Sequence, residues 1–286
     1  MKTISRSLFF LLWLVCCTQT NAQDEVNATA EDRAIFERYL REAKEWKTLP
    51  AGEVIIKTAK FFLETPYVAS TLEMEPEQLV VNLRELDCTT LVETTLALSQ
   101  TVCGDNPTFD KFCDNLRNLR YRNGIVSGYM SRLHYTSDWI YENGRRGLTQ
   151  DVTASIGGEA LPLRLSFMST HPDSYKQLKD NPAFVAETAT KETEINTRSY
   201  YYIPKDKIDA LSGGIKDGDM VCFTTTVEGL DISHVGIAHW VDGKLTFIHA
   251  SSTKKEVIVN EEPMSEYTAS IKSNSGVVIV RPLLVH

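Results

Sequence analysis

The chain has 286 residues, with 30 basic and 38 acidic side chains and a formal charge of −8 at neutral pH. It is long enough for one large or two small domains with a hydrophobic core. The acidic balance argues against nucleic acid as a partner, because binding to phosphates needs a basic surface. An anionic substrate would have to be bound by local arginines.

The N-terminus predicts a signal peptide over residues 1–22. Lys2 and Arg6 precede an apolar run at 8–15, and small residues occupy the −3 and −1 positions of a cut after Ala22. The run is too short to cross a bilayer, and no other segment could cross one. We therefore expect an exported, periplasmic chain, and loss of the two basic residues changes its charge from −8 to −10.

Six cysteines are present in the full chain. Cys16 and Cys17 lie in the signal peptide, and a lipid anchor there is not expected because a valine, not a small residue, precedes Cys16. Cys103 and Cys113 flank a short loop, so they could form a disulfide in an oxidising compartment or stay as two free thiols. Cys222 lies in a strand-like run and is interpreted as a core residue. The spacings match no zinc pattern.

Helices dominate the first hundred residues. The apolar spacing predicts helices at 31–47 and at about 53–63, with a break at Pro50. Thr65-Pro66-Tyr67 predicts a turn into an extended stretch. A third helix is expected to start at Cys88, with Asp87 as its N-cap.

That helix start is a candidate nucleophile site. The first turn of a helix has unpaired N–H groups and a dipole that favour negative charge, which lowers the pKa of a cysteine thiol. The alternative is that Cys88 is a small buried apolar residue.

Aromatic residues are dense in the middle of the chain. A helix is predicted at 109–119, and residues 128–141 combine aromatic rings with Arg132 and His134. Asn143-Gly144 predicts a turn, 161–168 a strand, and 173–179 and 182–193 two short helices.

The last third predicts antiparallel strands at about 200–203, 219–225, 232–241, 244–250, 257–259 and 277–280. Asp242-Gly243 is a strong signal for a two-residue hairpin loop. With Val241 paired to Lys244, Gly236 lies opposite His249, and His234 becomes a diagonal neighbour of His249 on the same face.

Two imidazoles on one face suit a general base and the group that orients it. The alternatives are two polar residues on a sheet, or a metal pair that would need a third ligand. His239 points to the other face and is given no role.

Five motifs occur in the order seen in NlpC-type papain-like cell-wall hydrolases. They are Thr65-Pro66-Tyr67, Asp87-Cys88-Thr89, the run 216–221 (KDGDMV), the run 233–237 (SHVGI) and His249-Ala250-Ser251. The chain resembles this family from about Phe36 to its C-terminus. Two features depart from the usual pattern: Thr89-Thr90 replaces Ser-Gly, and 146 residues separate the cysteine from His234.

The resemblance implies an α+β, papain-like fold in which a nucleophilic cysteine at a helix N-terminus packs on an antiparallel sheet. Residues 23–286 would form a single catalytic domain, with 104–200 as a large α/β insertion that binds substrate. Cys88 would be the nucleophile, His234 the base and His249 the orienting residue, with the Cys88 N–H in the oxyanion hole. The substrate-binding set would be Tyr67, Asp87, Tyr129, Arg132, His134, Tyr135, Trp139 and Ser233.

The insertion itself is similar to the N-acetylmuramoyl-L-alanine amidase-like branch, in which the Ser-Arg-Leu-His-Tyr run at 131–135 with Trp139, and Leu230 to His234, are typical. This implies a monomeric enzyme without cofactor or metal that cleaves the amide between muramic acid and L-alanine in peptidoglycan fragments. A glycan ring could stack on the aromatic residues, and Arg132 could bind a carboxylate. Alternatively, the aromatic run is the core of a small subdomain, and His134 makes a structural hydrogen bond.

Three other functions stay open from the sequence. The same fold could be an endopeptidase that cleaves the γ-D-glutamyl bond of the stem peptide. It could also be a non-catalytic cell-wall binding module, or a metal-binding protein. The sequence does not decide between intact sacculi and released fragments.

Overall fold

An eight-stranded sheet organises residues 26–284, the part of the chain that this computed structural model describes. The expected signal peptide at 1–22, with Cys16 and Cys17, lies outside these residues. The sheet runs in the order β4-β5-β10-β6-β7-β8-β9, with β3 added to β10, and its neighbours are antiparallel. The fold is therefore mixed α and β with an antiparallel sheet, as expected.

The strands of this sheet are β3 (Thr149–Asp151), β4 (Glu159–Leu161), β5 (Tyr200–Pro204), β6 (Met220–Thr225), β7 (Ile232–Val241), β8 (Lys244–Ser251), β9 (Glu256–Val259) and β10 (Asn274–Pro282). A separate parallel pair joins β1 (Val26–Asn27) to β2 (Leu79–Val80). The helices are α1 (Ala30–Glu42), α2 (Ala51–Phe61), α3 (Cys88–Cys103), α4 (Phe109–Arg120), α5 (Thr136–Arg145), α6 (Thr153–Ile156), α7 (Phe167–Thr170), α8 (Pro182–Ile195), α9 (Ile208–Leu211) and α10 (Met264–Ser270).

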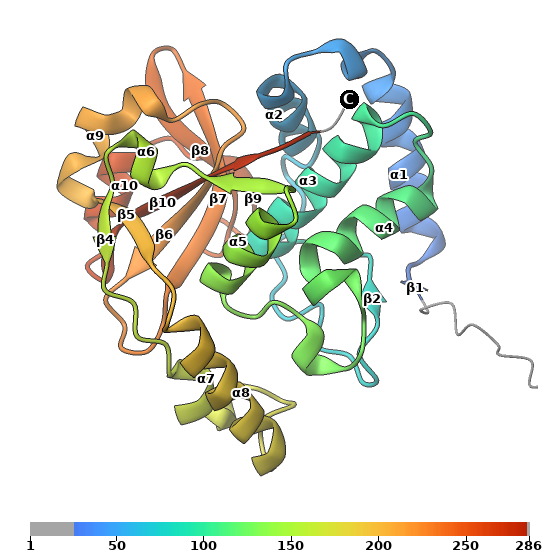
Figure 1. The fold of residues 1–286 in the computed structure, drawn as a ribbon. Coiled ribbons are helices and arrows are strands. Elements are labelled where there is room, and N and C mark those ends of the chain that lie inside the picture. The colour runs from blue at the N-terminus through green and yellow to red at the C-terminus, as the bar shows by residue number, and fades with distance from the viewer. Residues whose placement is uncertain (1–25, 285–286) are drawn as a thin grey trace, which may run out of the picture.

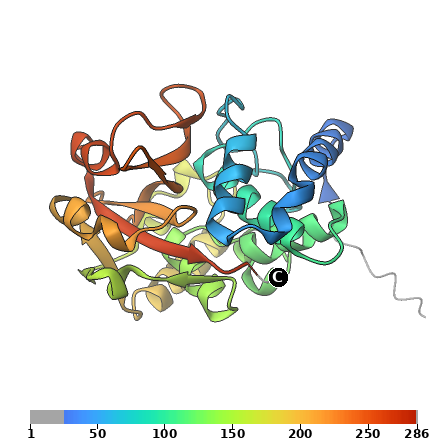
Figure 2. The same cartoon turned by 90° about the horizontal axis from the view of Figure 1, so that it is seen from above.

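Helices cover the sheet on both faces (Figures 1 and 2). The helices α1 to α4 lie on one side, while α6, α9 and α10 lie on the other. Strand β6 is buried on both faces, because Cys222 packs with the α1–α5 side and Phe223 packs with the opposite side. This explains its continuous apolar run, which is typical of a strand covered on both faces. Among the described residues no helix is long and apolar enough to span a bilayer.

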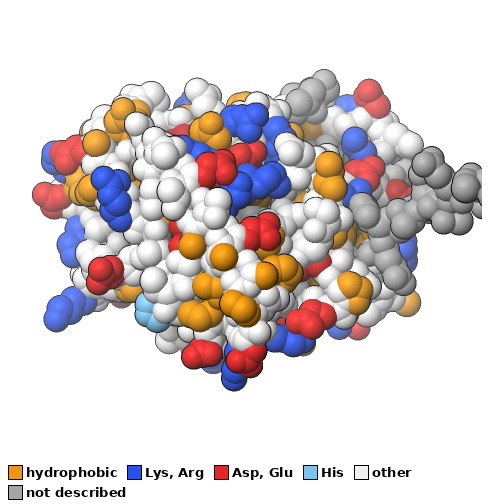
Figure 3. Space-filling model, turned by 60° about the horizontal axis from the view of Figure 1, so that its bottom comes forward, with side chains coloured by type: hydrophobic (Ala, Val, Ile, Leu, Met, Phe, Trp, Pro, Cys, Tyr) orange, Lys and Arg blue, Asp and Glu red, His pale blue; other side chains and the backbone are white. Residues whose placement is uncertain are grey.

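A third, smaller core lies under α7 and α8. Its buried members include Tyr129, Tyr135 and Met168. Figure 1 shows α7 and α8 below the rest of the molecule, and Figure 3, which brings that end forward, shows apolar side chains gathered between charged ones. Helices α4 and α5 instead contribute to the main core with α3. Residues 104–200 are thus divided between two cores, and their description as one inserted unit stays a prediction.

Several predicted elements are confirmed, among them the helix that starts at Cys88, the helix at 109–119 and the hairpin with Val241 paired to Lys244. Three predictions in the middle of the chain are wrong. Asn143-Gly144 lies inside α5, because the buried Asn143 amide donates to the carbonyls of Leu119 and Trp139.

The predicted strand at 161–168 ends at Leu161, and its alternating apolar residues pack into the small core from irregular backbone. The predicted helix at 173–179 is a 3₁₀ turn over Pro172–Ser174. Helix α10 and strand β3 were missed, because both are short and neither has a strong amphipathic pattern.

Candidate active site

The start of α3 is fixed by a reciprocal cap. The Asp87 carboxylate accepts from the Thr90 N–H at 2.8 Å, and the Thr90 hydroxyl accepts from the Asp87 N–H at 2.9 Å. Thr90 thus has a structural role that a glycine at this position could not provide. The cap sets the direction of the first turn, in which the Cys88 N–H and thiol lie next to strand β7.

The Cys88 thiol is half-buried and faces the backbone N–H of Val235, the residue that follows His234. Burial, with the Asp87 charge as a smaller cause, raises the pKa of the thiol to about 11. The N–H groups of Val235 and Thr89 act in the opposite direction but do not outweigh burial. The sequence-based expectation of a lowered cysteine pKa is therefore not met, and the thiol is neutral at pH 7.

The two histidines are hydrogen-bonded to each other. Nε2 of His234 lies 2.7 Å from Nδ1 of His249, and the rings are nearly perpendicular. They share one face of the sheet, as the hairpin register predicts. Gly236 makes this possible, because a Cβ there would lie 2.9 Å from the Ile248 carbonyl oxygen and 3.3 Å from the Cβ of His249.

Both imidazoles are neutral at pH 7. Burial lowers the pKa of His234 to about 4, and burial together with His234 lowers that of His249 to about 3. With Nε2 of His234 bonded to His249, its Nδ1 is the nitrogen left to accept a proton. Among the described residues no hydrogen bond joins the Cys88 thiol to His234, a common looseness in enzymes without substrate. His239 lies on the other face and contacts Asp217.

A groove of about 540 Å³ opens beside the histidines. Ser233, His234 and His249 line one wall, and Tyr267 of α10 lines another. Ser233 is exposed, and its hydroxyl donates to Asn274 at 3.0 Å. A smaller cavity of about 40 Å³ is lined by Thr89, Val235, His134 and both polar and apolar neighbours.

Two tyrosines approach the thiol. Burial raises the pKa of Tyr67, and Cys88 and Asp87 raise it further. Tyr67 therefore lies near Cys88, and its role in substrate binding stays a prediction. Tyr267 packs against His249 and Phe247, and burial with the nearby Cys88 raises its pKa to about 12. Sequence analysis missed Tyr267, because α10 was not predicted.

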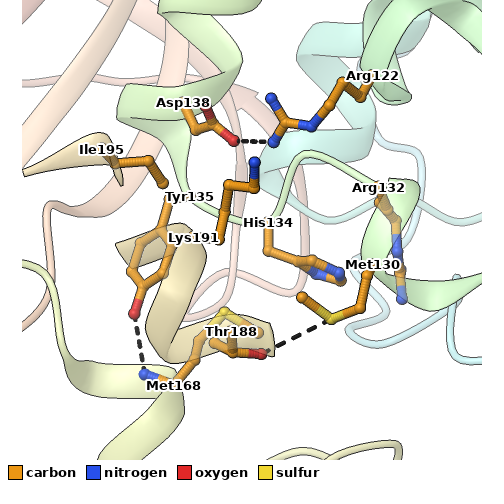
Figure 4. Close-up of a pocket in the computed structure, with 10 residues that line it drawn as sticks. All are labelled: Arg122, Met130, Arg132, His134, Tyr135, Asp138, Met168, Thr188, Lys191 and Ile195. Carbon is orange, nitrogen blue, oxygen red and sulfur yellow. Dashed lines mark hydrogen bonds and ion pairs between the residues drawn. The ribbon is translucent and has the colours of Figure 1, made fainter. Parts of the chain in front are cut away.

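The aromatic run is almost entirely interior. Tyr129, Tyr135 and Trp139 are 4%, 5% and 3% exposed. The Tyr135 hydroxyl donates to Glu192 and accepts from the Met168 N–H (Figure 4), while the Trp139 indole donates to Glu93. Tyr129 and Tyr135 match the alternative of a subdomain core, whereas Trp139 packs in the main core. Stacking of a glycan on these rings stays a prediction that their burial does not support.

The side chains of Arg132 and His134 also make contacts within the protein. Arg132 is 7% exposed and forms ion pairs with Glu73 and Glu77. His134 contacts the Tyr129 carbonyl oxygen at 2.8 Å, and its pKa falls to about 3 through burial and the nearby Arg132. Figure 4 shows both side chains at a small cavity of about 20 Å³. His134 also lines the cavity that includes Thr89 and Val235, and its role in substrate binding, like that of Arg132, stays a prediction.

The described cysteines are all free. Cys103 and Cys113 are buried and make no disulfide, and Cys222 is a buried core residue. No group of three or more His, Cys, Asp or Glu side chains within residues 26–284 is arranged to hold a metal ion.

Residues 57–277 match the family described as N-acetylmuramoyl-L-alanine amidase-like. A crystal structure of an N-acetylmuramoyl-L-alanine amidase from Bacteroides uniformis is 41% identical with a TM-score of 0.77, over 81% of this chain and 98% of that one. A protein from Bacteroides fragilis, named as a suspected xylanase, is 41% identical with a TM-score of 0.74, over 79% and 99% of the two chains.

A Legionella pneumophila protein shares the fold at 24% identity, with a TM-score of 0.67 over 88% of this chain and 95% of that chain. No curated protein matches the chain.

Proposed function

The chain belongs to the N-acetylmuramoyl-L-alanine amidase-like family, and on this premise we propose that it is an exported cysteine amidase. Its substrate would be the amide bond between the lactyl group of muramic acid and L-alanine in peptidoglycan fragments. One observation carries the proposal: His234 on β7 is hydrogen-bonded to His249 on β8, and the residue after His234, Val235, contacts the Cys88 thiol through its N–H.

The neutral site indicates the order of the proton transfers. Nδ1 of His234 takes the proton of the Cys88 thiol while sulfur attacks the lactyl carbonyl carbon. The resulting oxyanion is stabilised by the Cys88 backbone N–H at the start of α3. The imidazolium then gives its proton to the nitrogen of L-alanine, the C–N bond breaks, and a thioester remains. Water, deprotonated by His234, attacks the thioester and restores the thiol.

An endopeptidase that cleaves the γ-D-glutamyl bond would use the same three residues. The amidase is favoured because the family and a 41% identical neighbour both carry the amidase name. A xylanase would need two carboxylates facing a glycosidic bond. Among the described residues that line the groove beside His234, the acidic ones are Glu261 and Glu262, and the carboxylate beside Cys88, Asp87, is engaged in the helix cap.

A binding module without catalysis is the remaining alternative. It would not need a capped helix that holds a thiol against a histidine pair. We also propose that the insertion at 104–200 restricts the enzyme to released fragments. Equal activity on intact sacculi and on released fragments would contradict this proposed restriction to fragments.

Mass spectrometry of a purified disaccharide-tetrapeptide, incubated with the mature protein, tests the proposal. Free disaccharide and free tetrapeptide are expected with the wild type and not with Cys88→Ala. A sugar product that keeps L-Ala-D-Glu would replace the amidase by the endopeptidase. Products that also form with Cys88→Ala would exclude the cysteine mechanism.

A further inference from the structure

One ring nitrogen of His249 has no partner in the mechanism proposed above. His249 is 3% exposed, and its Nδ1 is bonded to His234. Its Nε2 is buried and makes no hydrogen bond of full geometry among the described residues. A buried ring nitrogen without a partner is costly, and which nitrogen carries the proton depends on what faces it.

Strand pairing brings one amide side chain to that nitrogen. On strand β9, Ile258 pairs with His249, and the Asn260 N–H donates to the Phe247 carbonyl oxygen at 2.8 Å. Asn260 is therefore opposite Phe247 and is a diagonal neighbour of His249 on the same face. His234, His249 and Asn260 follow one another across adjacent strands, and all three line the groove.

The amide of Asn260 is held in a fixed direction. Its Nδ2 donates to the Glu262 backbone carbonyl oxygen at 2.9 Å, and the Asn260 backbone is held separately, because its own carbonyl oxygen accepts from the Thr246 hydroxyl at 2.7 Å. With Nδ2 occupied, Oδ1 is the side-chain atom left to face His249. The amide also raises the pKa of His249 against the effect of burial, which is the direction expected for an acceptor beside an imidazole N–H.

We propose that Asn260 is a positioning residue that fixes the tautomer of both histidines. Its Oδ1 accepts from Nε2–H of His249, so Nδ1 of His249 carries no proton and accepts from Nε2–H of His234. Nδ1 of His234 is then unprotonated and available to the Cys88 thiol. This rests on the proposed function, in which His234 is the base, and it adds a third strand to the catalytic face.

Nuclear magnetic resonance of the mature chain with ¹⁵N-labelled histidine reads the tautomer of His249 without any substrate. Asn260→Leu removes the acceptor at similar size, Asn260→Asp keeps it, and Val259→Thr is a matched control on the other face of β9. We expect an Nε2–H tautomer in the wild type, in Asn260→Asp and in the control, and a mixture of tautomers in Asn260→Leu.

Fragment cleavage gives the second readout. Asn260→Leu should lower kcat by roughly 10- to 100-fold with little change in KM, because general-base catalysis contributes about 10² to 10⁴ and the base would be wrongly protonated in part of the molecules. Asn260→Asp should move the acid limb of the pH profile to higher pH, since a carboxylate favours the imidazolium. This second variant decides the question even if Asn260→Leu does not fold.

An Nδ1–H tautomer of His249 in the wild type would overturn the proposal. So would an Asn260→Leu variant with unchanged tautomer and kcat, or an Asn260→Asp variant with an unchanged acid limb. If the wild type cleaves no fragment, the proposed substrate fails on its own. The tautomer and the pH dependence of Cys88 alkylation by iodoacetamide then still test Asn260.

Discussion

Gly236→Ala tests whether the hairpin holds the two histidines by close backbone packing. The added Cβ would lie 2.9 Å from the Ile248 carbonyl oxygen, 3.0 Å from the Phe247 ring and 3.3 Å from the Cβ of His249. The first of these atoms is backbone, so strand β8 itself must move. Overpacking of this kind costs about 1–3 kcal/mol, which lowers Tm by roughly 2–12 °C in a chain of this size.

The same movement shifts the His249 ring by a few tenths of an ångström. Because misplacement of a catalytic group by about 1 Å can cost 100-fold, we expect fragment cleavage to fall by roughly 10-fold or more. Calorimetry and the cleavage rate measure the two effects. Gly213→Ala is the matched control, because a Cβ there has nothing within 4 Å. If Gly236→Ala behaved like this control in both assays, the packing argument would be refuted.

Three further changes have expected outcomes. Asp87→Ala should cost about 1 kcal/mol in urea unfolding through loss of the helix cap, and Asp87→Asn should cost less because it keeps an acceptor. Arg120→Leu should cost about 3–5 kcal/mol in the same assay, because Glu93 is left charged and buried, and adding Glu93→Gln should restore part of it. His134 titrates near 6.5 when unfolded and at about 3 when folded, so the unfolded state binds more protons and the unfolding free energy should fall as pH drops below 6.5. His134→Gln should reduce that slope by up to about 1.4 kcal/mol per pH unit, and an unchanged slope would show that His134 is not buried in the neutral form.

Local signals were sufficient to predict the helix start at Cys88 and the histidine pair. Asp87 and Thr90 are three residues apart, and their cap depends on little else. The Asp242-Gly243 loop fixes the register of β7 against β8, and the register places His234 with His249. The position of Asn260 beside His249 could not be predicted, because the loop at 252–255 has no comparable signal to fix the register of β9 against β8.

Burial could not be inferred from residue type. Tyr129, Tyr135 and Trp139 have the composition of a sugar-binding surface, but Tyr129 and Tyr135 pack with Met168 in the small core, and Trp139 packs in the main core. From the sequence, Arg132 was expected to be free to bind a carboxylate. In the structure it forms ion pairs with Glu73 and Glu77, which lie more than fifty residues earlier in the chain. These contacts depend on the tertiary structure and cannot be predicted from composition.

Burial also decides the ionisation of the candidate site. It raises the thiol pKa of Cys88 to about 11 and lowers the imidazole pKa of His234 to about 4, so each group is held in its neutral form at pH 7. The helix N-terminus does not reverse this, because its N–H groups are a smaller influence than loss of water. A neutral thiol is a poor nucleophile and also a poor target for oxidation, since the thiolate is the reactive species in both cases. If Cys88 is the nucleophile, as proposed, a neutral thiol makes the orientation of His234 by its neighbours decisive for the proton transfer.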